Sequence, residues 1–378
     1  MLENKVIFLY SPQAWGKMRL SKHHYAIELV KRGNTVYYIE TPENSNRRVR
    51  VSKQEEFQGL YIVKSGTMGV LNRHIRMKFP ALFNLLIKLN TSKIVRKINV
   101  KPDVVWSFDL NGFINLDVFP DAIKIAQPVD FVYPKNHIRA KKVDYIFSVA
   151  EEILEPLKIY CKNTYFVNHG VSEKLIEQQI IDNKNYDQNS VIKIAYVGNL
   201  LRNDIAHDQI IEVIKSHKEF EFNFIGNSKV SNISSSISDK SVSFITRLKS
   251  FPNVKLLGVL DTTELSKSLV EMDAFMICYD EERDMCKGTN YHKVLEYIAT
   301  GKVLISNHVT TYENLGLFEM TEKNKAKEEY KALFKKVTSN LSFYNSESLQ
   351  QKRIEFAKQH SYQKQVNKID ELLNLSTY

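Results

Sequence analysis

Residues 288 to 296 combine groups that bind phosphorylated ligands in proteins. Gly-Thr-Asn at 288–290 opens a stretch with helical spacing, predicted from about 289 to 300, in which Lys293 and Glu296 stand three residues apart. Such positions are neighbours on one helical face, and the free N–H groups of a helix start favour anions. The pattern predicts a cation and a carboxylate facing a nucleotide. A surface ion pair behind an ordinary cap is the alternative.

A second group of candidate ligands follows an apolar run that starts at residue 191. Gly198 stands at its end, in Tyr-Val-Gly-Asn, and Arg202 comes four residues later. A glycine at the carboxyl end of a parallel strand lets a ligand approach the backbone closely. The arginine would reach a phosphate there. A plain tight turn and a solvent-facing arginine explain the same residues.

The elements that must position these groups follow from the hydrophobic pattern. Short apolar runs alternate with helical spacing throughout the chain, which is typical of βαβ units with parallel sheets. The runs lie at 5–10, 35–40, 60–65, 103–108, 122–127, 144–149, 164–170, 191–199, 220–227, 253–258, 274–279 and 302–307. Helical stretches include those starting at 21, 207 and 262. Both halves therefore read as α/β, each a Rossmann-like domain.

A chain of 378 residues exceeds what one hydrophobic core usually supports. The polar run 178–190 predicts an exposed linker. We accordingly predict an N-terminal domain at 1–185, a C-terminal domain at 190–346, and a helical segment at 347–378 that crosses back to the N-terminal domain.

Composition excludes several classes of protein. The three cysteines, Cys161, Cys278 and Cys286, form no Cys-x-x-Cys pair, so we read them as buried thiols rather than as a disulfide framework or zinc site. The acidic run at 280–284 is read as a solvated loop, and no metal site is predicted. The chain shows no long apolar span and no signal-like start, which predicts a cytoplasmic protein.

Positive charge is concentrated in the first half of the chain. The net charge is +9 over residues 1–189 and +1 over 190–378, and no acidic residue lies between Glu56 and Asp103. Within that acid-free region, residues 73–99 interleave basic and large apolar side chains. Such a composition fits an anionic membrane surface. An ordinary helix with an apolar stripe in the core and snorkelling lysines fits it equally.

The order of these motifs resembles the GT-B glycosyltransferases. The stretch His-Lys-Val-Leu-Glu-Tyr-Ile-Ala-Thr-Gly-Lys from 292 to 302 looks like their nucleotide-sugar signature, and Tyr-Val-Gly-Asn at 196–199, Asn-His-Gly-Val at 168–171 and the Gly16–Gly33 stretch resemble other landmarks in the same order. The resemblance implies two Rossmann-like domains facing across a cleft, with the acceptor on the N-terminal domain and the donor on the C-terminal one. The donor-binding residues that it implies are Gly16, Gly198, Arg202, Gly258, Val259, Gly288, Thr289, Asn290, Lys293 and Glu296.

By this resemblance, Glu296 binds the ribose hydroxyls, and Lys293 and Arg202 hold the diphosphate together with backbone near Gly198 and 288–290. The nucleobase lies near 258–259, and Gly16 marks a loop facing the donor. The implied reaction moves a sugar, a hexose by type, from a nucleotide-sugar donor to a glycan or lipid-linked acceptor in bacterial surface polysaccharide synthesis. No cofactor is implied, and we expect metal independence.

One position departs from the family pattern. Retaining members of family 4 commonly carry a second glutamate eight residues before the helix glutamate, where this chain has Gly288. An inverting transfer needs a base at the acceptor hydroxyl. Asp109 and Asp130 both follow predicted strands, and we favour Asp130, whose loop resembles the acidic loop of GumK-like and teichuronic-acid-type enzymes. A routine loop or cap aspartate is the alternative.

Two other functions are weighed against this one. A nucleic-acid-binding protein would show the same basic half, but the sequence has no zinc-ligand spacing, helix-turn-helix or aromatic single-strand platform, so we expect no nucleic-acid partner. A sugar-nucleotide epimerase on the same fold would act on the donor without an acceptor. The expected location is cytoplasmic, with peripheral contact to the inner face of the cell membrane.

Overall fold

The computed structural model describes residues 1–16, 19–42, 48–66, 78–178, 181, 191–228, 238–284 and 287–375. The chain forms two compact units, Met1–His169 with Tyr362–Tyr378, and Gly170–Ser361. The first unit thus ends ahead of the predicted linker at 178–190, most of which lies outside the described residues. Helix α5 (Glu173–Glu177) packs with the second unit, against α8 and α9.

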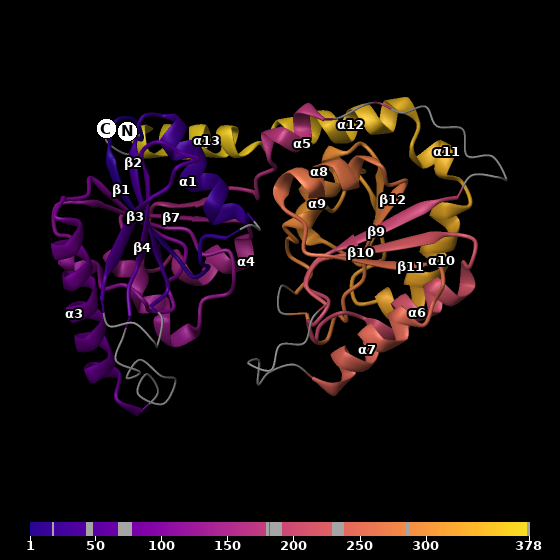
Figure 1. The fold of residues 1–378 in the computed structure, drawn as a ribbon, viewed down its shortest axis with the longest axis horizontal. Helices are drawn as coiled ribbons and strands as arrows, with labels where there is room; N and C mark the ends of the chain where they lie inside the picture. Colours follow the sequence, from indigo (N-terminus) through magenta and orange to yellow (C-terminus); the bar gives the residue numbers. More distant parts are fainter. Residues whose placement is uncertain are drawn as a thin grey trace. The chain divides into compact units, whose positions relative to one another are not determined.

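The first unit is built around an eight-stranded sheet in the order β3-β4-β2-β1-β5-β6-β7-β8 (Figure 1). All neighbours pair in parallel except β3 and β4. The strands are β1 (Val6–Ser11), β2 (Thr35–Glu40), β3 (Arg50–Lys53), β4 (Leu60–Lys64), β5 (Val104–Ser107), β6 (Ile123–Ala126), β7 (Tyr145–Ser148) and β8 (Thr164–Phe166). The helical segments are α1 (Ser21–Lys31), α3 (Pro80–Ile98), η1 (Leu116–Val118), η2 (Pro134–Lys142), α4 (Glu151–Leu154), η3 (Glu155–Leu157) and α13 (Tyr362–Leu375).

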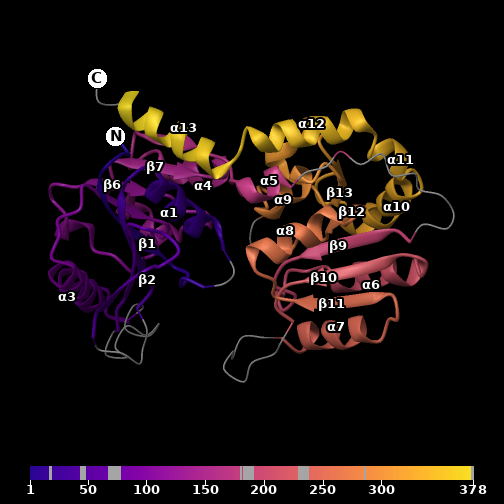
Figure 2. The ribbon, with the colours of Figure 1, turned by 45° about the horizontal axis from the view of Figure 1, so that its top comes forward.

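Apolar cores lie on both faces of this sheet. Ile94 and Ile98 of α3 join one core, and Leu29 of α1 joins the other. Helix α13 packs along α1 and adds Val366 and Ile369 to that second core, although it comes from the end of the chain (Figure 2). The predicted basic helix within 73–99 is α3, and residues 73–77 lie outside the described residues.

The second unit contains a six-stranded parallel sheet in the order β11-β10-β9-β12-β13-β14. The strands are β9 (Lys193–Val197), β10 (Glu221–Ile225), β11 (Val254–Gly258), β12 (Ala274–Ile277), β13 (Val303–Ser306) and β14 (Glu319–Met320). The helical segments besides α5 are α6 (His207–Ser216), α7 (Asp239–Lys249), α8 (Thr262–Val270), α9 (Lys293–Ala299), η4 (Thr310–Tyr312), α10 (Ala326–Thr338), α11 (Leu341–Tyr344) and α12 (Glu347–Lys358).

Both sheets contain the doubly wound strand order 3-2-1-4-5-6. In the second unit the chain moves outward from β9 to β10 and β11, then returns to continue on the other side of β9 with β12. The first unit does the same around β1 and β5. In such sheets ligands bind at the carboxyl ends of the strands, where the order reverses. The expected sites are therefore at β9/β12 and at β1/β5.

Three other expectations can be compared with the structure. Cys161 and Cys278 are buried thiols as predicted, and Cys286 lies outside the described residues. None of the described helices has the length and apolar character needed to cross a membrane. Within the described ranges, no three His, Cys, Asp or Glu side chains gather as a metal site would require.

Candidate active site

Three glycines bring the carboxyl ends of β9, β10 and β11 together. The Gly198 N–H donates to the Ile225 carbonyl (2.9 Å), and the Gly226 N–H donates to the Gly258 carbonyl (2.7 Å). A Cβ on Gly226 would lie 1.9 Å from the Gly198 carbonyl oxygen, and Gly226 has a φ of +137°. No side chain fits between these backbones. The three glycines therefore leave the backbone at these strand ends uncovered by side chains, at the predicted nucleotide site.

Tyr297 fixes helix α9 to this edge. Its buried hydroxyl accepts a hydrogen bond from the Val197 N–H (2.7 Å) and donates to the Val197 carbonyl (3.3 Å). Burial raises the pKa of Tyr297 well above its usual value, so the hydroxyl keeps its proton and both bonds. The bonds between Tyr297 and Val197 thus hold α9 beside the switch point between β9 and β12.

Lys293 and Glu296 form an ion pair on that first turn. Lys293 Nζ lies 2.7 Å from Glu296 Oε2, and the two side chains are 14% and 20% exposed. A surface pair would be far more exposed; Lys325 and Glu322, at the same spacing, are 54% and 68% exposed. The predicted pair is thus partly enclosed at the switch point while still reachable by a ligand.

Residues 288–290 differ from the prediction. Helix α9 starts at Lys293, not near 289, and these residues form a turn before it. The Gly288 N–H donates to Asp284 Oδ2 (2.7 Å), the Gly288 carbonyl accepts from the Thr310 N–H (2.7 Å), and the Thr289 carbonyl accepts from the Thr311 N–H (3.0 Å). Gly288 has a φ of +64°, which a helix excludes. This loop therefore supports α9 and does not form the end of a longer helix.

Asp284 was read as part of a solvated acidic loop, and that reading is wrong. Its side chain is only 5% exposed. Besides the Gly288 N–H, Asp284 Oδ2 accepts from the Tyr291 hydroxyl (2.5 Å), which in turn accepts from Asn307 Nδ2 (2.9 Å). Burial and the adjacent carboxylate raise the pKa of Tyr291. The buried network anchors the loop to the strand end after β13.

Arg202 lies in the loop between β9 and α6. Its guanidinium forms a two-point ion pair with Asp204, with Nε 2.7 Å from Oδ1, and lies 5.0 Å from the centre of the Tyr279 ring. The pair with Asp204 raises the pKa of Arg202, so the charge is permanent. The Ala206 N–H donates to the Cys278 carbonyl (3.0 Å), which ties this loop to the end of β12.

The structure thus gathers part of the predicted donor set. Gly198, Arg202, Lys293 and Glu296 all lie on elements that meet at the β9/β12 switch point. Gly258 ends β11 at the sheet edge, and the neighbouring Val259 is 52% exposed, leaving an open surface there. Gly16 belongs to the first unit, and a Cβ on it would meet no described atom within 4 Å.

A larger hollow in the second unit, of about 1870 Å³ including space open to solvent, lies elsewhere. Residues of α6, α7, the 279–283 loop and the start of α10 line it, and none of the predicted donor residues does. Its acidic side chains outnumber its basic ones. Such a wall repels a diphosphate, so we do not place the donor there.

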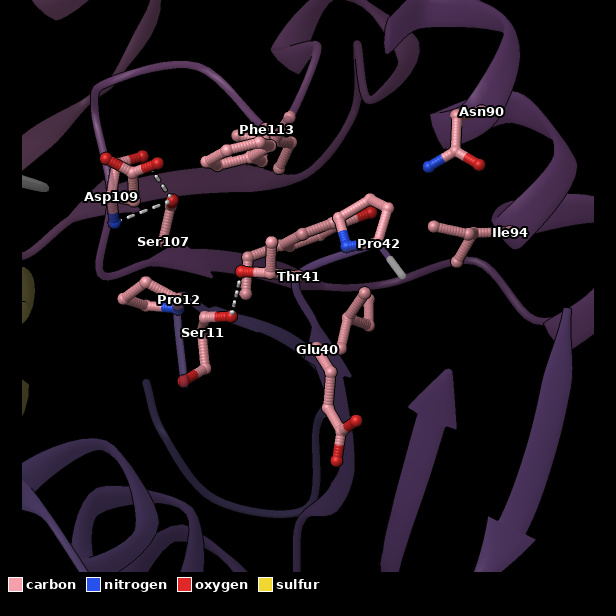
Figure 3. A pocket seen from close by; sticks show the side chains of 13 residues that line it. Ser11, Pro12, Glu40, Thr41, Pro42, Asn90, Ile94, Ser107, Asp109 and Phe113 are labelled. Atoms are coloured by element: carbon pink, nitrogen blue, oxygen red, sulfur yellow. Dashed lines mark hydrogen bonds between the residues drawn. The ribbon is translucent and has the colours of Figure 1, made fainter. Parts of the chain in front are cut away.

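The first unit has a recess at its own switch point, between the ends of β1, β2 and β5. The free space there is about 340 Å³ when open solvent is included, and only about 20 Å³ of it admits a water-sized molecule. Figure 3 shows Glu40, Asn90, Asp109 and Phe113 around it, with Asn90 on α3. The wall combines carboxylates, an amide and an aromatic ring, which is the chemistry that binds the hydroxyls and the apolar face of a sugar.

The two candidate bases differ in their positions. Asp109 lines the recess, and its Oδ1 accepts from the Asn111 N–H (2.6 Å). Asp130 is exposed, follows β6, and is not among the residues that line the recess. Lys22, on the first turn of α1, is only 5% exposed; burial lowers its pKa, and the charges of Asp130 and Asp109 oppose that shift. One buried ammonium therefore lies near both carboxylates.

Sequence reasoning missed Gly226, Tyr297 as an anchor, Asp284 and Lys22. A signal existed for the first: Val-Gly-Asn at 197–199 and Ile-Gly-Asn at 225–227 repeat an apolar residue, glycine and asparagine after consecutive strands. Asp284 stands among Asp and Glu residues that are more exposed than it is, and nothing local distinguishes it from them. Lys22 lies in an apparently ordinary helix start. The roles of Tyr297, Asp284 and Lys22 follow only from the packing of elements that are distant in the sequence.

No family model and no curated protein matches this sequence at a significant level. Solved structures do match it in fold. The sucrose-phosphate synthase of Thermosynechococcus elongatus is 9% identical, with a TM-score of 0.72 and 99% of each chain covered. The Anabaena protein HepE, solved with UDP and glucose, is 11% identical, with a TM-score of 0.65, 99% of this chain and all of its own covered.

A third match is the lipopolysaccharide outer core galactosyltransferase WaaB, 14% identical with a TM-score of 0.61, covering 96% of this chain and 98% of its own. Likeness across nearly the whole chain, at identities this low, is evidence about fold. Together with the two doubly wound sheets, it shows that this chain has the GT-B fold of the glycosyltransferases.

Proposed function

We propose that this chain is a glycosyltransferase that moves a sugar from a nucleotide-sugar donor to a glycan or lipid-linked acceptor in bacterial surface polysaccharide synthesis. The observation that carries the proposal is the partly enclosed Lys293–Glu296 pair at the β9/β12 switch point of a nucleotide-binding type of sheet. HepE, of the same fold, was solved with UDP and glucose, and WaaB is named a galactosyltransferase. These neighbours support a nucleotide-sugar donor here.

The proposed roles follow the chemistry of each group. The Glu296 carboxylate accepts hydrogen bonds from the two ribose hydroxyls, and Lys293 and Arg202 neutralise the diphosphate. The backbone edge at Gly198 lets the diphosphate approach closely, and the base rests at Gly258 and Val259. The Gly288 N–H already donates to Asp284, so we propose that the 288–290 loop shapes this site by positioning α9.

In the reaction, the bond from the anomeric carbon to the diphosphate breaks and the nucleotide leaves with its electrons. The acceptor hydroxyl oxygen bonds to that carbon, and its proton passes to a carboxylate of the first unit. We propose Asp130 for that base, with inversion of configuration, and propose that the chain works without a metal ion. We also propose that the protein is peripheral on the inner face of the cell membrane, where residues 73–99 contact the surface.

Measuring donor binding tests the proposed role of the Lys293–Glu296 pair. Calorimetric titration of the full chain with UDP, GDP, ADP and CMP sugars should identify one nucleotide class that binds. Glu296→Gln keeps the shape but loses charge. It should weaken that donor by on the order of 30- to 200-fold, because two hydrogen bonds each fall from about 1.5 to 3 kcal/mol to about 0.5 to 1.5 kcal/mol.

Glu322→Gln is the matched control, since Glu322 forms an exposed ion pair with Lys325 at the same spacing. It should bind the donor as the unmodified chain does. Equal donor affinity in Glu296→Gln and Glu322→Gln would remove the α9 carboxylate from the site.

A further inference from the structure

Side chains hold the backbone of residues 13–16, which follow β1 at the carboxyl edge of the first sheet. Among the described residues, no backbone–backbone hydrogen bond involves this stretch, which we call the 13–16 segment. The Trp15 N–H donates to Glu40 Oε1 (2.8 Å). The Gln13 carbonyl oxygen lies 2.9 Å from the hydroxyls of both Tyr38 and Ser11. Two of these partners stand two residues apart on β2, so they project from one face of that strand.

The start of α1 supplies the other two partners of the segment. His23 Nε2 donates to the Ala14 carbonyl (3.0 Å). Arg19 Nη1 donates to the Gly16 carbonyl (2.6 Å), and the guanidinium carbon of Arg19 lies 4.2 Å from the centre of the Trp15 ring. The Arg19 side chain is only 13% exposed, so it is packed into the loop. Four consecutive residues are therefore each bonded to a side chain from a different part of the first unit.

Glu40 is a buried carboxylate within this arrangement. Its side chain is 3% exposed, and the half-exposed Lys64 ammonium lies 3.7 Å from Oε2. Burying a carboxylate is unfavourable unless hydrogen bonds and opposite charges compensate it. A leucine at this position would avoid that penalty but could not bond the Trp15 N–H. The bond to the segment is thus what the buried carboxylate adds.

The 13–16 segment begins at the switch point of the first sheet. Ser11 and Pro12, directly before it, line the recess together with Glu40. In doubly wound sheets, the loops at this point contact the ligand. Glu40 therefore belongs both to the wall of the recess and to the support of the loop beside it.

We propose that Glu40 and Arg19 are positioning residues of the transfer, which fix the 13–16 segment before substrates bind. They act through the backbone of Trp15 and Gly16. A loop that is already fixed does not have to be ordered when the reaction proceeds, and the groups that it presents stay in place. This inference rests on the proposed function. A purely structural role predicts a different result, in which the variants lose stability while the folded molecules turn over normally.

Kinetics of two Glu40 variants separate these roles. Glu40→Leu removes the acceptor of the Trp15 N–H, whereas Glu40→Gln keeps one. In Glu40→Leu, kcat per folded molecule should fall by on the order of 100-fold, the effect of displacing a group by about 1 Å. Nucleotide affinity should not change, because the residues proposed to bind the nucleotide belong to the second unit. Glu40→Gln should restore most of the rate, and Arg19→Met, which loses the Gly16 bond, should behave like Glu40→Leu.

Fluorine NMR observes the segment without any turnover. The chain has two tryptophans, Trp15 and Trp106, so the fluorotryptophan-labelled full chain gives two signals, which Trp15→Phe assigns. In the substrate-free chain, Glu40→Leu should broaden or split the Trp15 signal, because the segment then adopts several conformations. The signal of the fully buried Trp106 should stay as it is. Glu40→Gln should leave both signals sharp.

Asp144→Leu is the matched control, since Asp144 accepts the Lys124 N–H (2.7 Å) at the opposite, amino edge of the same sheet. It should change neither kcat nor the Trp15 signal. A sharp Trp15 signal in Glu40→Leu, or a normal kcat of that variant when folded, would overturn the inference alone. Absence of transfer by the unmodified chain would instead contradict the proposed function, and the fluorine signals would still decide whether Glu40 holds the segment.

Discussion

Asp109 and Asp130 follow β5 and β6, which are neighbours in the first sheet, and the buried Lys22 ammonium lies near both. A carboxylate at either position could accept a proton from an acceptor hydroxyl. At the scale of single residues the site thus has two candidate bases. Asp109 lines the recess, and Asp130 is the more exposed of the two.

Replacement of each carboxylate distinguishes them. Asp130→Asn should lower the rate of the chemical step by roughly 10² to 10⁴-fold with donor affinity unchanged, the usual cost of losing a general base. A loss confined to Asp109→Asn would move the base to the recess. Product configuration is the independent check by NMR: retention at the anomeric carbon would contradict a base role for either residue.

Residue-level prediction succeeded where chemistry is local and failed where it depends on distant contacts. The proximity of Lys293 and Glu296 follows from helical spacing, and their side chains form an ion pair at 2.7 Å. That both face a nucleotide stays a prediction. The turn at 288–290 depends on the 310–311 backbone and on Asp284, neither of which the local pattern indicates. Gly288 was predicted to contact the ligand. Its positive φ and the His308 carbonyl oxygen, which would lie 2.9 Å from an added Cβ, explain why glycine stands at this position.

At the scale of elements, the start of α1 is held by a neutral histidine. His23 Nδ1 accepts from the Leu20 N–H (2.8 Å), and Nε2 donates to the Ala14 carbonyl (3.0 Å), so the ring caps the helix and fastens the preceding loop. The side chain is 1% exposed, and burial lowers its pKa to about 4. Protonation at Nδ1 would also break the bond to Leu20.

The pH dependence of stability follows from this shift. Because the folded pKa lies below the unfolded value of about 6.5, the neutral ring stabilises the fold fully above pH 6.5, and that stability is lost as the pH falls toward 4. The loss is up to about 3 kcal/mol. His23→Asn keeps an acceptor for the Leu20 N–H but does not titrate. Denaturant unfolding between pH 7 and 4 should show a smaller decline for this variant, and parallel curves would contradict the assignment.

Strands proved easier to predict than helix ends. Every apolar run named in the sequence contains a strand, because buried parallel strands need continuous apolar residues. The pattern missed β3, an antiparallel edge strand with two exposed lysine or arginine residues, and β14, which has two residues. The pattern also placed the start of α9 too early, because the turn at 288–290 is held by Asp284 and by the backbone of residues 310–311.

At the scale of the whole molecule, one fold appears twice in the chain. Each unit has the 3-2-1-4-5-6 strand order, and each candidate site lies where that order reverses. The final helix α13 belongs to the first unit, where Asp370 pairs with the Met1 amino group (2.8 Å) and with Arg32. Strand order depends on long-range packing, which periodicity does not encode, whereas the α/β class does follow from it. The return of the chain was expected for 347–378, and the part that joins the first unit begins at Tyr362.

The central claim is acceptor-dependent transfer from a nucleotide sugar, and turnover measures it most directly. The full chain is incubated with the nucleotide sugar that it binds, with and without candidate glycan and lipid-linked acceptors, while released nucleotide and glycosylated acceptor are quantified together. The account predicts equal amounts of both, release that depends on the acceptor, loss of turnover in Glu296→Gln and full turnover in Glu322→Gln. Conversion of the donor to an isomeric nucleotide sugar without any acceptor would contradict it and identify an epimerase.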